Sequence, residues 1–334
     1  MLFREITEKY EKERFSPYAT LSENTRGRMF HEPPCEVRTE FQRDRDRILH
    51  AKAFRRLKHK TQVFLSPEGD HYRTRLTHTL EVAQISRTVA RALQLNEDLT
   101  EAIALGHDLG HTPFGHSGER VLNEVHPTGF HHNVQSLRVV DHLEKGKRGY
   151  GLNLTFEVRN GILHHTGSES PATLEAQIVK ISDRIAYINH DIDDAIRAGV
   201  LKYEDLPKDC LENLGFTHSD RINAMIMDVI YQSQHQTMIT QSQEKLFYID
   251  KLRSFMFDNV YLNKKAKREE EKAQHIIQEL YHYFLRKYDK LPDEMRQRIQ
   301  EFGVQETVKD YIAGMTDRYA IQKYLDIFVP TVWK

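Results

Sequence analysis

The chain of 334 residues is long enough to bury a sizeable core, as one large domain or one domain with a smaller annex. Its 48 basic and 49 acidic residues give a net charge of −1, which excludes a global electrostatic attraction to nucleic acid. No apolar run is long enough for a transmembrane helix, and the charged start of the chain shows no signal peptide. Two cysteines, Cys35 and Cys210, provide neither a disulfide framework nor a thiolate metal cluster. We therefore expect a cytoplasmic protein without membrane contact, in which histidines and carboxylates hold any metal.

Helical periodicity dominates the chain and strand-type alternation is nearly absent, which predicts an all-α fold. Residues 1–40 are polar and contain loop-forming prolines, which favours an N-terminal arm or an irregular cap. Residues 41–200 are predicted to form the helical core. Residues 201–334 are predicted to form a helical C-terminal annex that completes this core. Gly149–Leu154 could form a short β-hairpin arm.

The helical pattern begins at Phe41, and the first helix with a chemical signal is predicted over Thr77–Leu95. His78 lies one turn before Val82 on the apolar face of this helix and should point into the core. A lone histidine on an apolar face is more often a hydrogen-bonded core residue than a metal ligand. Arg75 would lie one turn earlier if the helix extends back that far, and its guanidinium could neutralise phosphate oxygens.

The segment Gly106–Glu119 combines three histidines and two carboxylates with four glycines. The preceding apolar helix begins with Asn96 or Asp98 as its N-cap, so His107 and Asp108 are expected in its last turn, with Gly110 as a stop signal after them. An isolated His-Asp pair is usually a polar helix end. The same pair can share one divalent ion if further ligands come from elsewhere in the chain.

Histidines continue beyond this pair, at His111, His116 and His132. Loop histidines beside a cation can bind oxyanions or transfer protons near neutral pH, although any single one is as often bonded to a backbone carbonyl. His116 and Glu119 are three residues apart, so on a helical turn the carboxylate would orient this histidine and stabilise its protonated form. Ser117 lacks the strand–turn–helix setting of a nucleophile elbow, so a serine hydrolase is excluded.

Helices are also predicted over Ser136–Leu143, Phe156–His165 and Ala172–Ala198. In the last of these, isoleucines repeat every three or four residues along one buried stripe. The opposite face carries Asp183, Tyr187, His190, Asp191 and Asp194. An ordinary solvated face would carry Lys, Glu and Gln instead, so this pattern favours a helix that lines a cleft, with Asp183 as a ligand.

The last third of the chain carries weaker signals. Lys264–Lys272 is a run of mixed charge, which is typical of a solvated helix start rather than of a nucleic-acid site. Val308–Phe328 is amphipathic, and core packing explains it without a cofactor. The only tryptophan, Trp333, follows this segment.

Two imidazoles and two carboxylates can therefore meet in one bundle-core site, formed by His78, His107, Asp108 and Asp183. This ligand set suits a hard or borderline divalent ion with open positions for water or phosphate, and Mn²⁺, Mg²⁺ and Fe²⁺ are all admissible. A purely structural Zn²⁺ fits less well without cysteine. A metal, an arginine and several histidines around one cleft describe a phosphate-ester site better than a carbonyl site.

These residues resemble the HD-domain phosphohydrolases, and within them the deoxyguanosine triphosphate triphosphohydrolase-like proteins. The resemblance covers most of the chain, as an ordered series of motifs. They are Arg26–Arg28, Phe41–Arg47, Phe54–Phe64, Arg75–Thr79, His107–His116, His132–Ser136, Asp183–Tyr187 and Ile312–Ala320. It implies that residues 41–200 form an HD-domain helical bundle with catalytic activity.

The resemblance also implies an activity, the hydrolysis of a deoxynucleoside triphosphate (dNTP) to deoxynucleoside and inorganic triphosphate, with attack at the α-phosphorus. It assigns metal binding to His78, His107, Asp108 and Asp183, and catalysis to His116 and Glu119. It places His111 and His132 near the phosphates, Arg75 on a phosphate, and Gln62, Tyr187 and Asp191 on the deoxyribose. Arg184 stands where many relatives carry Asp, so a neighbouring carboxylate is missing here.

Family members assemble as symmetric oligomers, so the resemblance implies a homo-oligomer such as a tetramer or hexamer, with oligomer contacts from residues 201–334. Allosteric activation by a dNTP and binding of single-stranded DNA stay open from the sequence. One alternative is another HD-type activity, on cyclic nucleotides, nucleoside monophosphates or guanosine tetraphosphate. A second is a dNTP-sensing or nucleic-acid-binding regulator with a vestigial site, against which the complete ligand set and the His116–Glu119 pair argue.

Overall fold

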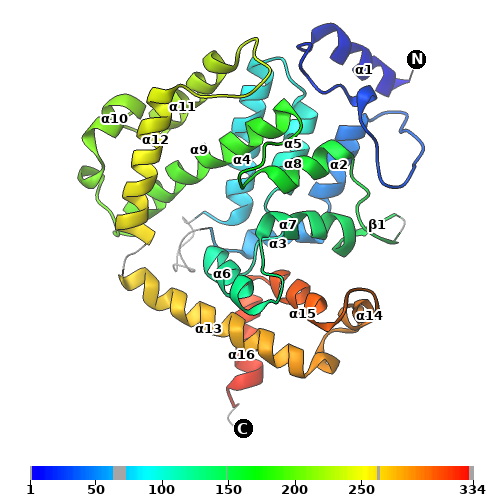
Figure 1. Ribbon diagram of the computed structural model, residues 1–334, viewed down its shortest axis with the longest axis vertical. Helices are drawn as coiled ribbons and strands as arrows, with labels where there is room; N and C mark the ends of the chain where they lie inside the picture. Colours follow the sequence, from blue (N-terminus) through cyan, green and yellow to red (C-terminus); the bar gives the residue numbers. More distant parts are fainter. Residues whose placement is uncertain (1, 63–72, 148, 262–263, 331–334) are drawn as a thin grey trace.

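The computed structural model describes residues 2–62, 73–147, 149–261 and 264–330, and Figure 1 shows a helical molecule. The longer helices are α1 Phe3–Arg14, α2 Glu40–Leu49, α3 Lys52–Arg56, α4 Arg75–Ala92, α5 Glu97–Gly106, α6 Gly115–Val125, α7 His132–Arg138, α8 Phe156–His164, α9 Leu174–Arg197, α10 Lys208–Leu214, α11 His218–Ser233, α12 Gln243–Met256, α13 Lys264–Arg286, α14 Asp293–Phe302, α15 Val304–Ala313 and α16 Asp317–Phe328. Short helical turns are η1 Ser22–Asn24, η2 Leu57–His59, η3 Val139–Leu143, η4 Tyr203–Asp205, η5 Phe257–Tyr261 and η6 Tyr288–Lys290. The all-α prediction is confirmed.

The strands that the structure describes are two very short ones, β1 Lys145–Gly146 and β2 Gly149–Tyr150, paired antiparallel with Lys145 opposite Tyr150. This hairpin begins a few residues before the predicted arm. Among the described residues, no helix combines the length and the hydropathy needed to cross a bilayer. Trp333 and the Val63–Phe64 part of one sequence motif lie outside the described residues.

The buried apolar side chains form two clusters. The first is built by α2 to α5 and α8 to α12, around fully buried residues such as Leu99 and Ile103. The second joins α6 with α13, α15 and α16, around Tyr281 and Phe284, and these helices lie together in the lower part of Figure 1. The C-terminal region is therefore shared between the clusters, and α6 leaves the first cluster to pack on the second. The predicted metal ligands lie on or beside helices of the first cluster, and His116 and Glu119 lie on α6.

Local sequence signals explain where the site helices begin. Thr74 accepts a hydrogen bond from the Thr77 amide at the start of α4, so this helix extends back to include Arg75. Of the two N-caps expected for α5, the structure uses Asn96, whose side chain accepts from the amides of residues 98 and 99. These caps place Arg75 one turn before His78, as the sequence allowed.

The end of α5 differs from the prediction, because the helix stops at Gly106 and both His107 and Asp108 lie just beyond it. Ser136 explains the difference. Its hydroxyl donates to the His107 carbonyl at 2.7 Å and accepts from the Gly110 amide at 2.9 Å, so the chain leaves the helix to dock on α7. A Cβ at Gly110 would collide with the backbone nitrogen of Ser136. Gly110 is therefore required for close packing rather than as a left-handed helix stop.

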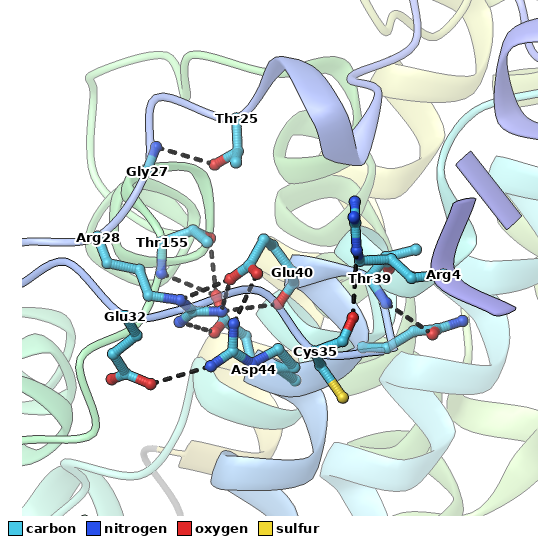
Figure 2. A network of polar contacts seen from close by, with 12 residues as sticks. Arg4, Thr25, Gly27, Arg28, Glu32, Cys35, Thr39, Glu40, Asp44 and Thr155 are labelled. Carbon is cyan, nitrogen blue, oxygen red and sulfur yellow. Dashed lines mark hydrogen bonds and ion pairs between the residues drawn. The ribbon is translucent and has the colours of Figure 1, made fainter. Parts of the chain in front are cut away.

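The first 40 residues contain the 12-residue helix α1, which the sequence did not predict. This segment is held to the core by buried polar contacts. The Glu175 carboxylate on α9 accepts from the amide and the hydroxyl of Thr20, both at 2.9 Å. Figure 2 shows a second anchor, in which Arg28 reaches Glu40 and Asp44 on α2.

Replacing Asp44 by alanine is expected to destabilise the fold by about 3–5 kcal/mol, measured by urea denaturation. Asp44 is fully buried and also accepts from the amide and hydroxyl of Thr155, so its loss leaves several donors and the buried Arg28 without their main acceptor. Asp46→Ala on the same helix is the control. It removes partly exposed ion pairs with Arg38 and Arg45 and is expected to cost less than about 1 kcal/mol. Equal costs for the two variants would contradict this account.

Candidate metal centre and active site

Three packed helices bring the four predicted metal ligands together. His78 lies in the first turns of α4, His107 and Asp108 follow α5, and Asp183 lies in α9. The Nε2 atom of His78 is 3.0 Å from Asp183 Oδ1 and 4.0 Å from Asp108 Oδ2. The Nε2 atom of His107 is 3.4 Å from Asp108 Oδ1 and 3.7 Å from Asp183 Oδ1. Residues more than 100 positions apart in the sequence therefore converge on one point.

These separations match the ligand shell of one divalent ion. In an octahedral site with ligands at about 2.1 Å, neighbouring ligand atoms lie about 3.0 Å apart and opposite ones about 4.2 Å apart. The four separations, from 3.0 to 4.0 Å, lie between these limits. The candidate ligand atoms of His78, His107 and Asp108 also lie within 4.8 Å of one another, and all three residues are buried. The residues present therefore fit a metal.

The protonation of His107 supports the same conclusion. Its Nδ1 atom lies 2.6 Å from the Ala104 carbonyl oxygen, which can only accept, so Nδ1 carries a proton. The Nε2 atom is buried and makes no hydrogen bond within the described part of the chain. A buried polar atom without a partner is costly, and a metal ion would satisfy this lone pair.

The charges of the centre favour a cation. Burial alone would raise the pKa values of Asp108 and Asp183, but the neighbouring histidines, and Arg75 beside Asp108, hold both well below their usual range. Burial likewise opposes protonation of His107, yet the carboxylates of Asp108 and Asp183 outweigh it and raise its pKa to about 9. The two carboxylates thus attract positive charge to the point where the ligand atoms meet, and a divalent ion would replace the proton.

A chain of side chains behind His78 orients it, and sequence reasoning did not find this chain. His190 Nδ1 lies 3.4 Å from His78 Nδ1, and His190 Nε2 lies 3.3 Å from Glu81 Oε2. Because the carboxylate can only accept, His190 donates from Nε2 and its Nδ1 accepts from His78. The Nε2 lone pair of His78 is then left for the metal. His190 had been placed on the cleft-lining face of its helix without a role.

Replacing His190 by phenylalanine is expected to weaken divalent-metal binding about 10–100-fold, the usual effect of losing a residue that orients a metal ligand. Asparagine at this position can still present an oxygen to His78 Nδ1 and is expected to retain most of the affinity. Mn²⁺ affinity measured by calorimetry tests both variants, with thermal unfolding as the check on folding. If the two variants bind the metal equally, the acceptor role of His190 is wrong.

A second group of candidate ligands shares Asp108 with the first. Asp108, His111 and His132 have ligand atoms within 4.8 Å of one another, and His111 Nε2 is 3.2 Å from Asp108 Oδ1. The rings of His111 and His132 stack at 4.0 Å with an angle of 17°. Burial and the nearby Arg75 hold the pKa of His111 well below its usual value, so His111 stays neutral. The predicted loop histidines therefore line the same centre.

The Glu119 carboxylate contacts His132 more closely than His116, the partner that the sequence suggested. It accepts from the His132 backbone amide at 2.9 Å and from His132 Nδ1 at 3.0 Å, whereas His116 Nδ1 lies 3.6 Å away on a side chain that is 82% exposed. Burial would raise the pKa of Glu119, but its contacts with His116 and His132 hold it below the usual range. Glu119 therefore serves both histidines.

The neighbour of His132 fixes its protonation. His165 Nδ1 donates to the Ile162 carbonyl at 2.7 Å, so His165 Nε2 carries the lone pair. His132 Nε2 lies 3.2 Å from this atom and must donate to it. His132 therefore contacts Glu119 through Nδ1 and His165 through Nε2, and the Glu119 carboxylate lies where it would balance a charge on this ring. His165, which ends the predicted helix at residues 156–165, is a further site residue that sequence reasoning missed.

Arg75 contacts Asp108 in the metal centre. The predicted sugar-binding residues lie on α9 and near the start of α6. Arg75 Nη1 donates to Asp108 at 2.8 Å, and its buried Nε has no partner among the described residues. Tyr187 and Asp191 follow Asp183 by one and two turns on α9, half-buried and buried respectively. Gln62 lies beside the start of α6, where a Cβ on Gly115 would be 3.4 Å from its carbonyl oxygen and 3.5 Å from Arg75 Nη2.

The C-terminal motif Ile312–Ala320 connects two segments that border the candidate site. Asp317, at the start of α16, accepts from the Thr61 amide at 2.8 Å and from the Phe114 amide at 2.9 Å. It therefore ties the segment that carries Gln62 to the loop that precedes α6. The sequence showed this aspartate only as part of a motif, because its partners lie about two hundred or more positions away.

Comparisons with known proteins agree with the fold and the site. Residues 75–188 match the HD domain model, and residues 239–326 match the phosphohydrolase-associated domain model. The HD match begins at Arg75 and includes all four metal-ligand candidates. These features define the chain as a helical HD-type phosphohydrolase.

Relatives of nearly the same length make the assignment more specific. The chain is 60% identical over 333 residues to a deoxyguanosinetriphosphate triphosphohydrolase-like protein of Caldanaerobacter subterraneus subsp. tengcongensis, covering 100% of this chain and 98% of the relative. It is 48% identical to a protein of the same description from Clostridium tetani, with 99% and 98% covered. The chain belongs to the deoxyguanosinetriphosphate triphosphohydrolase-like family of HD-domain proteins.

Solved structures share the fold at low sequence identity. A phosphohydrolase from Bacteroides thetaiotaomicron superposes with a TM-score of 0.52 at 18% identity, covering 85% of this chain and 69% of the other. A hypothetical protein from Aquifex aeolicus superposes with a TM-score of 0.50 at 21% identity, covering 84% and 67%. At these identities the likeness supports the architecture alone.

Proposed function

We propose that this protein hydrolyses deoxynucleoside triphosphates, dGTP among them, to the deoxynucleoside and inorganic triphosphate in a metal-dependent reaction. The observation that carries the proposal is the convergence of His78, His107, Asp108 and Asp183, with the buried His107 Nε2 facing both carboxylates but making no hydrogen bond among the described residues. The family of the chain points to the same substrate class. Mn²⁺, Mg²⁺ and Fe²⁺ all fit this nitrogen and oxygen ligand set.

When bound, the divalent ion would polarise an α-phosphate oxygen and supply a bound water as the nucleophile. In the reaction, the water oxygen bonds to the α-phosphorus, the bond from phosphorus to the 5′-oxygen breaks, and the 5′-oxygen takes up a proton. Arg75 donates hydrogen bonds to phosphate oxygens and offsets their charge, with the neutral ring of His111 beside them. Both lie within contact distance of Asp108, so a phosphate held by them would lie beside the metal ligands.

We assign the transfer of a proton to the leaving 5′-oxygen to three residues, His116, Glu119 and His132. His132, paired with Glu119, keeps a proton beside the phosphates. His116 shares that carboxylate at the open edge of the site and donates to the leaving 5′-oxygen as the general acid. The contacts with both histidines keep the Glu119 carboxylate ionised although it is buried.

The sugar pocket is proposed to involve Gln62, Tyr187 and Asp191. The ring of Tyr187 would pack against the sugar edge, and Asp191 would accept a hydrogen bond from the 3′-hydroxyl, so a 2′-hydroxyl would meet the ring. This arrangement would reject ribonucleotides. We expect the purified protein to prefer dGTP over GTP in side-by-side turnover assays.

The experiment that tests the proposal is an assay of purified protein against each dNTP, alone and in mixtures, with Mn²⁺, Mg²⁺ and Fe²⁺ in turn. Release of inorganic triphosphate and deoxynucleoside in equal amounts is the expected result, and a chelator should stop it. Release of phosphate or diphosphate instead would indicate a different HD-type activity. Faster turnover in mixtures would indicate dNTP activation, and light scattering of the same preparation would measure the proposed tetramer or hexamer.

A further inference from the structure

A cavity of about 110 Å³ lies between the first part of the core and the C-terminal helices. Its walls come from α3, the loop after α5, α7, η3, α14 and α15, which lie close together in Figure 1. The predicted metal ligands and the predicted catalytic residues do not line it. Five cationic side chains do: Lys52, Arg56, Lys60, Lys145 and Arg298.

The three carboxylates in the walls are already engaged elsewhere. Glu144 accepts from the backbone amides of residues 52 and 53 and caps α3. Asp310 pairs with Arg138 at 2.7 Å and accepts from Gln135 at 2.9 Å. Glu294 lies 3.4 Å from Lys145 at the exposed edge. Asp310 and Glu294 are therefore balanced by Arg138 and Lys145, and the single charge of Glu144 is outnumbered by the four remaining cations of the cavity.

Two of the remaining cations are deeply buried. Lys60 is 3% exposed and its ammonium donates to the carbonyls of His111 and Ala313. Arg298 is 5% exposed, donates to the carbonyls of His142 and Leu143 at 2.8 and 3.0 Å, and leaves its Nε without a partner. Neither forms an ion pair within the described ranges of the chain. Carbonyl oxygens satisfy hydrogen bonds but leave a buried net charge, which is unfavourable until an anion joins it.

We propose that this cavity binds a phosphate-type oxyanion, as free phosphate or as the end of a polyphosphate chain. Arg298 Nε and the ammonium of Lys60 supply the buried contacts, and Arg56 and Lys52 supply charge at the exposed rim. Tetrahedral oxyanions with several acceptors match guanidinium and ammonium donors well.

The size of the cavity and its neighbours fit this ligand. About 10–15 Å³ of such space admits one water, so the cavity has room for an oxyanion of five heavy atoms together with some water. Lys60 also connects the cavity to the candidate active site, because its second acceptor is the backbone carbonyl of His111. An anion that orders Lys60 would therefore also order the loop that carries this histidine. The binding site itself does not depend on which nucleotide the enzyme hydrolyses.

Calorimetric titration of the whole protein with inorganic phosphate, and separately with inorganic triphosphate, at constant ionic strength tests the proposal. Arg298→Gln is expected to weaken phosphate binding about tenfold, the usual effect of losing one charged hydrogen-bonding group. Arg56→Gln, at an exposed rim position that does not support the fold, is expected to weaken binding about threefold. The matched control is Arg296→Gln. Arg296 lies on α14 like Arg298, but it is exposed and outside the cavity, so this variant should bind phosphate like the unaltered protein.

The two ligands distinguish the sources of the anion. Tighter binding of triphosphate would identify the end of a polyphosphate chain as the ligand, and equal binding would identify free phosphate. Binding that Arg75→Gln abolishes and Arg298→Gln leaves intact would place the anion in the metal centre and overturn the proposal. Absence of saturable binding to the unaltered protein would overturn it too.

Discussion

Replacing His107 by alanine is expected to lower metal-dependent dNTP hydrolysis by about a thousandfold or more, with the bound metal lost from the protein. His107 Nε2 is buried and makes no hydrogen bond within the described residues, and the Ala104 carbonyl fixes the opposite nitrogen as a donor. An alanine removes this ligand atom from a site that solvent reaches poorly. Turnover and metal content of the same preparation measure both effects.

His126→Ala is the matched control for this variant. His126 is also buried, but it bonds to Tyr281 and Glu306 in the second cluster, away from the centre. Its loss is expected to reduce the free energy of unfolding while metal content and turnover per folded molecule stay unchanged. If the two variants lose activity in proportion to their loss of stability, His107 is a structural residue and the proposed ligand role is wrong.

Replacing Glu119 by glutamine is expected to lower kcat about 10²–10⁴-fold, which is the range for losing proton transfer in a hydrolase. Glutamine keeps the size of the side chain but not the charge that would balance a protonated His132. It also removes the carboxylate that faces His116. Metal content is expected to stay unchanged, because this residue lies outside the four-ligand set.

Glu124→Gln is the control for charge loss on the same helix, since Glu124 is exposed. It should leave kcat within about twofold, as is usual for surface changes. A Glu119→Gln protein with normal kcat would contradict the proposed proton-handling role. Loss of metal together with activity would instead assign Glu119 to the metal centre.

Much of the fold could be predicted because its signals are local. Asn96 before an apolar run predicts a helix start, and the isoleucine stripe of α9 predicts a long buried helix, which the structure shows as Leu174–Arg197. The four ligand candidates could be gathered from sequence because each lies at a helix end or on a helix face where its type is unusual. The end of α5 was predicted two residues late, since Ser136, which draws the chain away, is distant in sequence.

The rest of the site depends on which helices touch. The chain from Glu81 through His190 to His78 exists because α4 packs against α9, and a helical pattern does not give the rotation of one helix about another. The pairing of Glu119 with His132 was missed for a similar reason. Spacing of three residues favoured His116, whereas the tertiary fold brings the His132 ring closer.

The central claim is that His78, His107, Asp108 and Asp183 together hold one divalent ion. Anomalous diffraction from crystals soaked in Mn²⁺ tests it most directly, because it locates the ion without any assumption about activity. We expect an anomalous peak about 2.0–2.3 Å from the Nε2 atoms of His78 and His107 and from one carboxylate oxygen each of Asp108 and Asp183. A peak that leaves Asp183 unliganded, or no peak between these four side chains at saturating Mn²⁺, would contradict it.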